Sequence, residues 1–121
     1  MKVDLLTNKH DKNRINILLE DIVDNPRENA IILLEEVDLK YFYGNDNKAK
    51  LKVLETNNIK DVGLLRSNPK NDYNLCIIEI QNLDNNQLNE INDEFTGKKD
   101  LIGVVINKTL TCTYRLNYLS K

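Results

Sequence analysis

The chain has 121 residues and carries 17 basic and 19 acidic side chains, for a formal net charge of −2. A chain of this length is expected to form one compact domain, here residues 1–121, with its own hydrophobic core. The longest apolar run, residues 30–34, has five residues. A bilayer span needs about 20, so we expect no association with a membrane.

The start of the chain has no secretory apolar region, because Asp4 interrupts its apolar stretch. We therefore expect a cytoplasmic protein of a bacterium, or of the host cytosol if a phage encodes it. In that reducing compartment Cys76 and Cys112 are expected to stay reduced and packed. The chain has 19 asparagines and 13 lysines against two alanines, which is typical of an AT-rich genome such as that of a phage or other mobile element.

The first predicted elements are a short strand over residues 2–6 and a helix over residues 13–24. Asn25-Pro26 ends this helix, because a residue before proline is pushed out of the helical region. One apolar stripe at helical spacing consists of Ile15, Leu18, Leu19 and Ile22.

Residues 29–43 fit two patterns. In one, Asn25 caps a helix that has Pro26 in its first turn and ends at Gly44. In the other, apolar and charged side chains alternate up to a turn, and residues 49–53 alternate again after it. We favour the second pattern, a β-hairpin, in which Glu35-Glu36 marks a bulge or bend.

The second half begins with a predicted strand over residues 62–66, a turn at 68–72 and a central strand over 73–81, which is rich in β-favouring side chains. A helix over residues 85–95 follows, capped by Asp84 and ended by Gly97. Its inward stripe is Leu88, Ile91 and Phe95.

Residues 101–106 and 110–118 are predicted to form a final hairpin, and apolar and polar side chains alternate over nine positions in its second strand. The order strand, helix, strand, strand thus occurs twice, over residues 2–55 and 73–118. We predict an α+β fold, an antiparallel sheet with two helices packed on one face. The repeated order also allows two β-α-β-β pseudo-repeats.

No complete catalytic site is found. His10 next to Asp11 has the chemistry of a general base, but we interpret it as a solvated side chain at a helix start. No second histidine is present to activate a hydroxyl or a thiol. The four glycines form no phosphate-binding loop. We predict no catalytic residue, no cofactor and no metal site.

One spacing offers an enzymatic alternative. Asp38 and Lys40 have the D-x-K spacing of metal-dependent nucleases, with Asp24 or Glu20 as further ligands. The same spacing recurs in the turn at 46–48, as expected by accident in a chain with 30% charged residues. A small divalent-metal nuclease or phosphodiesterase is therefore the alternative hypothesis.

Lys48, Lys50 and Lys52 lie two residues apart, which places them on one face of a strand. Such a row can follow phosphates, but no aromatic residues interleave with it. We interpret it as a solvated edge strand whose lysines oppose edge-to-edge pairing. Nucleic acid is therefore not the expected partner.

The acidic side chains gather in one segment. Residues 71–97 contain six acidic residues and neither lysine nor arginine. On the predicted second helix Glu90, Asp93 and Glu94 lie outside the apolar stripe, so they project outward or sideways. An acidic helix face accelerates association with a basic partner.

Tyr41, Phe42 and Tyr43 hold three of the seven aromatic side chains and lie directly before a turn. Strand alternation sends Tyr41 and Tyr43 to one face and Phe42 to the other. An exposed tyrosine next to a loop is typical of an interface anchor.

The leading hypothesis is a small non-enzymatic binding protein that neutralises or sequesters a protein partner with a basic surface. Immunity proteins, antitoxins and phage-encoded inhibitors act in this way. The predicted partner-binding residues are Glu90, Asp93, Glu94, Tyr41, Phe42 and Tyr43. A third hypothesis is an accessory subunit that forms homo-oligomers by pairing sheet edges.

Overall fold

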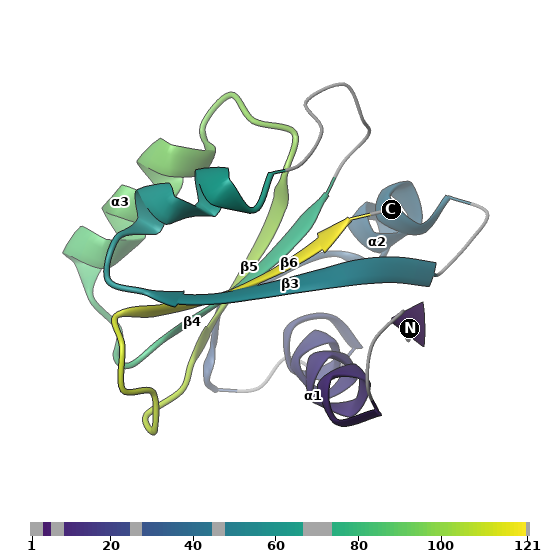
Figure 1. Cartoon of the computed structure of the whole chain (residues 1–121), viewed down its shortest axis with the longest axis horizontal. Helices are drawn as coiled ribbons and strands as arrows, with labels where there is room; N and C mark the ends of the chain where they lie inside the picture. The colour runs from purple at the N-terminus through teal and green to yellow at the C-terminus, as the bar shows by residue number, and fades with distance from the viewer. Residues whose placement is uncertain (1–3, 6–8, 25–27, 45–47, 67–73, 121) are drawn as a thin grey trace.

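The computed structural model describes residues 4–5, 9–24, 28–44, 48–66 and 74–120. Within them a six-stranded sheet lies between helices on both of its faces (Figure 1). The strands are β1 (Asp4–Leu5), β2 (Ala30–Ile32), β3 (Lys48–Thr56), β4 (Leu75–Ile80), β5 (Leu101–Ile106) and β6 (Tyr114–Ser120). The helices are α1 (Lys9–Leu19), its π-helical continuation η1 (Glu20–Asp24), α2 (Glu36–Tyr43), the 3-10 helix η2 (Ile59–Leu64) and α3 (Asn85–Phe95).

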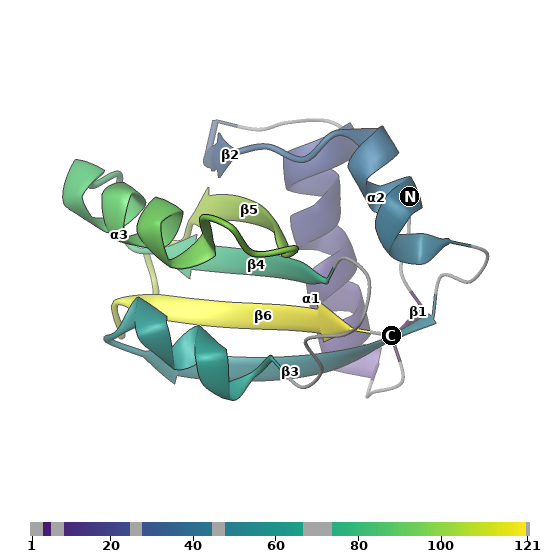
Figure 2. The same cartoon turned by 90° about the horizontal axis from the view of Figure 1, so that it is seen from above.

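The strands lie in the order β1-β3-β6-β4-β5-β2. β6 is antiparallel to both β3 and β4, whereas β4 and β5 are parallel, as seen from above in Figure 2. The predicted α+β class is confirmed, and two helices, α1 and α2, contribute to the core on one face. The sheet is mixed rather than antiparallel.

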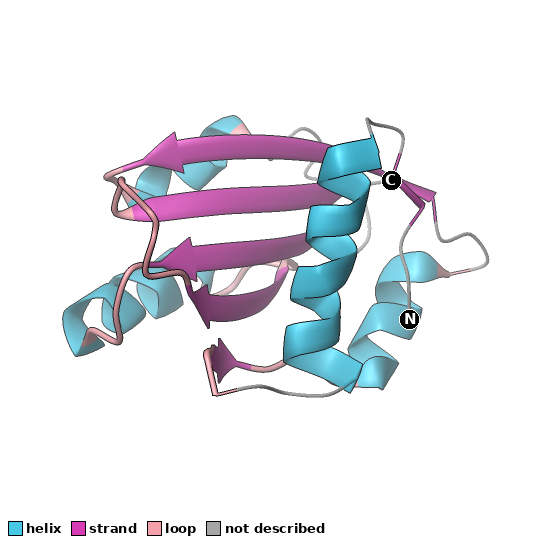
Figure 3. Cartoon of the chain, turned by 90° about the horizontal axis from the view of Figure 1, so that it is seen from below, coloured by secondary structure: helices cyan, strands magenta, loops and turns pink. Residues whose placement is uncertain are grey.

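Strand β4 is central, as predicted, and all six of its residues are buried. Its side chains alternate between two cores, because successive strand residues point to opposite faces. Leu75 and Ile77 pack with α1, η1 and α2 on the face that we call the α1 face. Cys76 and Ile78 pack with η2 and α3 on the opposite face, the α3 face. The second predicted helix therefore lies across the sheet from the first, as Figure 3 shows from the α1 face.

Local signals predicted both long helices well. Helix α3 has the expected bounds; the Asp84 carboxylate accepts hydrogen bonds from the backbone N–H groups of Asn86 (2.8 Å) and Gln87 (3.2 Å). Gly97 follows with a φ of +76°, which favours glycine. Helix α1 starts at Lys9, earlier than expected. Its predicted stripe is nonetheless inward, with Leu18 partly buried and Ile15, Leu19 and Ile22 fully buried.

The hairpin predicted from residues 29–43 is wrong. Only Ala30–Ile32 form a strand, and it pairs with β5; α2 follows. The Glu35-Glu36 pair begins this helix, and the Glu35 N–H donates to the Asp38 carboxylate at 3.1 Å in a capping box. Gly44 ends it with a φ of 56°. The alternation was too short to distinguish a strand from a helix, so the caps at its two ends decided the structure.

Residues 62–66 are not a strand either, because η2 occupies Ile59–Leu64. The Asn58 side chain caps η2 by accepting from the Lys60 N–H at 3.1 Å, and the Thr56 hydroxyl donates to Asp61. Four predicted features lie wholly or partly outside the described residues: the strand over 2–6, of which β1 covers residues 4–5, the helix end at Asn25-Pro26, the turn at 68–72 and the first residue of the strand over 73–81.

The predicted hairpin of β5 and β6 is wrong because β4 lies between them and pairs with both. Strand β6 begins at Tyr114, four residues later than expected. The pseudo-repeat is not supported either. Helix α2 interrupts the first unit, and β2 pairs with β5 rather than with a strand of its own unit. The order of elements along the chain therefore does not give the order of strands in the sheet, which long-range pairing decides.

Gly103 on β5 lies directly against the Ile22 side chain of η1. A Cβ atom at this position would lie 2.5 Å from Cδ1 of Ile22, which is closer than carbon atoms pack. We predict that Gly103→Ala lowers the free energy of unfolding by about 1–3 kcal/mol through overpacking. Ile22→Val, which removes that Cδ1, is expected to cost about 0.5–1.5 kcal/mol alone.

The double variant tests this cause. If the clash is with Cδ1, Gly103→Ala/Ile22→Val loses less stability than the sum of the two single losses in urea unfolding. Additive losses would show that another contact makes Gly103 necessary.

Candidate functional site

The acidic residues of α3 form one wall of a surface groove. Ile91 and Phe95 are buried against the sheet, and this orientation leaves Glu90 and Asp93 exposed and Glu94 at the rim. The other wall is formed by residues 57–60, where β3 ends and η2 begins. The groove has a volume of about 360 Å³, which is enough for one large side chain of a partner.

The side chains of Asn57 and Asn58 form hydrogen bonds that hold residues 57–60 in place. The Asn57 side-chain oxygen accepts from the N–H and from the hydroxyl of Thr113, both at 3.0 Å. Asn58 caps η2. Because both asparagines are engaged in this way, this wall of the groove has a fixed shape.

The three carboxylates of the groove differ in their surroundings. Glu90 accepts a hydrogen bond of 2.9 Å from the Tyr114 hydroxyl. Glu94 forms a 3.1 Å ion pair with Arg66. Asp93 is exposed, and it makes no hydrogen bond or ion pair with another described residue. It is therefore the acid of the groove whose replacement disturbs the fold least.

Arg66 links η2 to α3 and to the start of β5. Its guanidinium lies 5.0 Å from the centre of the Phe95 ring and 2.7 Å from the Asp100 carboxylate. Residues 71–97 contain neither lysine nor arginine, yet Glu94 has a cationic partner in the folded chain. The fold supplies Arg66 from outside that segment.

Two buried tyrosines complete the polar contacts on this face. The Tyr118 hydroxyl donates to Asp100 at 2.7 Å and accepts from the Asn74 amide at 3.1 Å. Burial, and then the hydrogen bonds to Glu90 and Asp100, raise the pKa values of Tyr114 and Tyr118 well above the usual 10.0. Both phenols therefore stay protonated in the folded protein at neutral pH.

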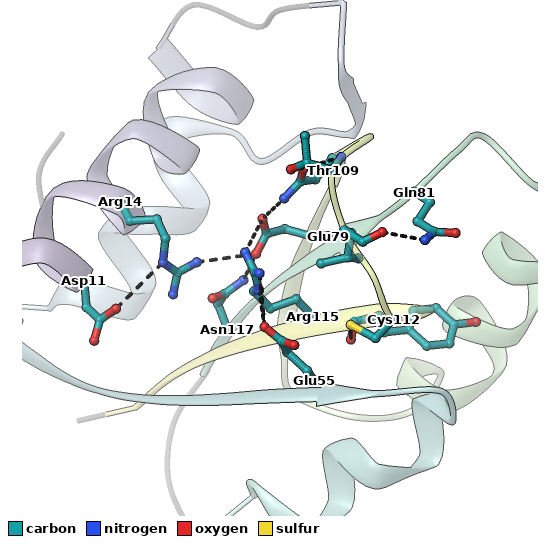
Figure 4. Close-up of polar contacts among 12 residues, drawn as sticks. Asp11, Arg14, Glu55, Glu79, Gln81, Thr109, Cys112, Arg115 and Asn117 are labelled. Atoms are coloured by element: carbon teal, nitrogen blue, oxygen red, sulfur yellow. Dashed lines mark hydrogen bonds and ion pairs between the residues drawn. The ribbon is translucent and has the colours of Figure 1, made fainter.

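A second polar cluster, the Glu79 cluster, lies on the α1 face, and sequence analysis missed it. Glu79, the next-to-last residue of β4, is 3% exposed. Its carboxylate accepts from Asn117 and Asn107, each at 3.0 Å, and Figure 4 shows two arginines pointing toward it. Arg14 on α1 and Arg115 on β6 each reach it at 3.4 Å. A charged residue inside an apolar central strand was the signal for this cluster.

The outer part of the Glu79 cluster borders a pocket of about 280 Å³. Glu55 lies 3.0 Å from Arg115, and Asp11 lies 3.8 Å from Arg14. His10, which we interpreted as a solvated side chain, is exposed and lines this pocket. Each arginine thus has an inner and an outer carboxylate, which is the arrangement of a structural ion-pair network.

The aromatic segment lies far from the acidic groove. Tyr41 is 65% exposed, whereas Phe42 and Tyr43 are buried in the core of the α1 face. The predicted strand alternation of these side chains is wrong because the segment is helical. Figures 1 and 2 place α2 and α3 at opposite ends of the molecule. The six predicted partner-binding residues therefore do not form one surface.

The residues of the nuclease hypothesis are not brought together on a strand. Asp38 and Lys40 lie on α2, and the Asp38 carboxylate caps that helix. Glu20 is exposed on η1, and the side chain of Asp24 lies outside what the structure describes. Within the described residues, no group of three His, Cys, Asp or Glu side chains has the arrangement of a metal site.

Cys76 and Cys112 are not joined in a disulfide, and Cys76 is packed in the core of the α3 face, as expected. Burial raises the pKa of the Cys76 thiol well above its usual value. Cys112 is only partly buried; its thiol donates to the Tyr114 carbonyl at 3.1 Å, and it lies in the loop before β6 rather than within the predicted strand.

No family model matches the chain, and no curated protein matches it. In the described part of the chain, every helix is too short or too polar to cross a membrane.

The Glu79 cluster yields a stability prediction. Glu79→Gln should lower the free energy of unfolding by about 2–5 kcal/mol, because it leaves two partly buried arginines without their inner carboxylate. Glu55→Gln is the matched control, since the Glu55 side chain is 50% exposed. Glu55→Gln should lower the free energy of unfolding by less than about 1 kcal/mol. Both variants are measured by urea unfolding. Equal losses for the two variants would contradict a central role for Glu79.

The tyrosine pKa values yield a pH prediction. Both phenols have folded-state pKa values above the unfolded value of about 10. Their contribution to stability is therefore complete below pH 10 and is lost as the pH rises above it. We expect the free energy of unfolding to fall steeply in that range. The fall should be smaller in Tyr114→Phe and Tyr118→Phe. The absorbance of ionised tyrosine from these two residues should appear only as the protein unfolds. An unchanged slope in both variants would refute this assignment.

Proposed function

We propose that this chain is a non-enzymatic binding protein that neutralises or sequesters a protein partner with a basic surface. It would act as immunity proteins, antitoxins and phage-encoded inhibitors do. The binding site is the groove between α3 and residues 57–60, and the partner inserts a lysine or arginine side chain into it.

The proposal is supported by one observation, the placement of three carboxylates along a groove large enough for a side chain. Glu90 and Glu94 each use one oxygen within the protein, Oε2 toward Tyr114 and Oε1 toward Arg66. This fixes the two side chains while leaving the second oxygen of each for a ligand, and Asp93 adds an exposed carboxylate. A prearranged set of acceptors loses little side-chain entropy when a cation binds.

Charge in the groove acts mainly on the rate of association. A lysine or arginine that enters forms charge-assisted hydrogen bonds with fixed carboxylates. The acidic face also steers a basic partner during diffusion, an effect that salt weakens. Lys60 at the far wall would contact an acidic group next to the inserted side chain.

We further propose a cytoplasmic location. The support is that both cysteines are free thiols, which is typical of proteins from reducing compartments.

Asp93→Lys tests the proposed groove with little risk to the fold. We expect the wild-type chain, immobilised on beads, to retain basic proteins from a bacterial lysate and to release them as salt rises. Asp93→Lys should retain them at least about tenfold less, because it replaces attraction with repulsion at the mouth of the groove. The retained proteins would be measured by quantitative mass spectrometry.

Glu20→Lys is the matched control, because it reverses an exposed acid on η1, on the α1 face. It should retain the same proteins as the wild type. If Asp93→Lys also retains them unchanged while it unfolds at the wild-type urea concentration, the acidic groove is not the binding site.

A further inference from the structure

We propose that the outer edge of β3 binds an extended acidic segment of a partner protein as an added β-strand. This surface is separate from the α3 groove and does not depend on the function proposed for that groove.

Among the described residues, the β3 edge is the longest open edge of the sheet. β3 pairs with β6 from Lys50 to Thr56. On its other side β1 pairs only with Lys48 and Ala49, and no other described strand lies there. Figure 1 looks onto this edge, with α1 below it and η2 and α3 above it. Backbone N–H and C=O groups along such an edge can pair with an incoming strand.

The two faces of β3 present different chemistry to such a strand. Lys50 and Lys52 are exposed on the α3 face, and neither makes an ion pair with a described residue. On the α1 face Leu51 is partly buried and Val53 is 42% exposed. The matching strand therefore alternates acidic residues, opposite the two lysines, with apolar residues opposite Leu51 and Val53.

The pocket of about 280 Å³ beside Val53 gives this edge a place for a side chain. It opens on the α1 face, next to Glu55 and the two arginines of the Glu79 cluster. In strand addition, backbone pairing gives affinity and pockets for alternate side chains give specificity. An apolar residue of the added strand would pack on Val53 at the mouth of the pocket.

The lysines also argue against a second copy of this chain as the occupant. Antiparallel pairing of two β3 strands brings the lysines of both copies onto the same face, where like charges repel. The same lysines attract an acidic strand. Charge on β3 thus selects between the two kinds of partner.

A short labelled peptide with glutamate at alternate positions, and valine or threonine between them, tests the proposal by fluorescence anisotropy. We expect saturable binding to the wild-type chain. Lys50→Glu/Lys52→Glu should weaken it roughly tenfold or more, because two attractive cross-strand pairs become repulsive. The same variant should bind the peptide that has lysine in place of glutamate.

Two controls distinguish strand addition from attraction between charges alone. Lys98→Glu/Lys99→Glu reverses two exposed charges after α3 and should bind the acidic peptide like the wild type. A peptide N-methylated at alternate residues keeps its charge but loses backbone donors, and it should not bind.

Each contrary result overturns the proposal. Such results are equal binding of the N-methylated peptide, equal loss in both lysine variants, no binding of the acidic peptide, or self-association through β3. Asp93→Lys should leave peptide binding unchanged, so failure at the α3 groove and failure at β3 are distinguishable.

Discussion

The structure depends on a carboxylate buried in its central strand. Glu79 takes a position on β4 that an apolar residue would otherwise fill, and a buried charge without partners is costly. Its partners come from α1, from β6 and from the residue after β5. Arg14 lies 65 residues from Glu79 in the sequence, so the carboxylate has its full set of partners only once α1 has packed on the sheet. The Glu79 cluster thus selects one arrangement of α1 against the sheet.

The α3 face has a comparable link in Arg66. Its contacts to Glu94, Asp100 and Phe95 join η2 to α3 and to the start of β5. Tyr118 adds a bond from β6 to Asp100. Polar links of this kind add little net free energy compared with apolar burial, but their geometry permits few alternative packings. Each face therefore combines a large apolar core with one polar link.

The polar links also determine which charges remain for binding. Glu94 is engaged with Arg66 and Glu90 with Tyr114, so the acidic wall of the groove is fixed in shape and still has acceptor oxygens. On β3, Lys50 and Lys52 extend from an edge strand. The molecule thus has an acidic groove on α3 and a basic strand edge on β3.

Elements with local signals could be predicted from the amino-acid sequence alone. Asp84 and Gly97 defined α3, the stripe of Ile15, Leu19 and Ile22 oriented α1, and the β-favouring side chains of residues 75–80 made β4 central. It also placed Glu90, Asp93 and Glu94 outside the core. The pairing of strands, the position of α3 across the sheet from α1 and the contact of Arg66 with Glu94 became visible only in the folded chain. Caps and periodicity act within a few residues, whereas strand pairing and ion pairs depend on segments that meet only after folding.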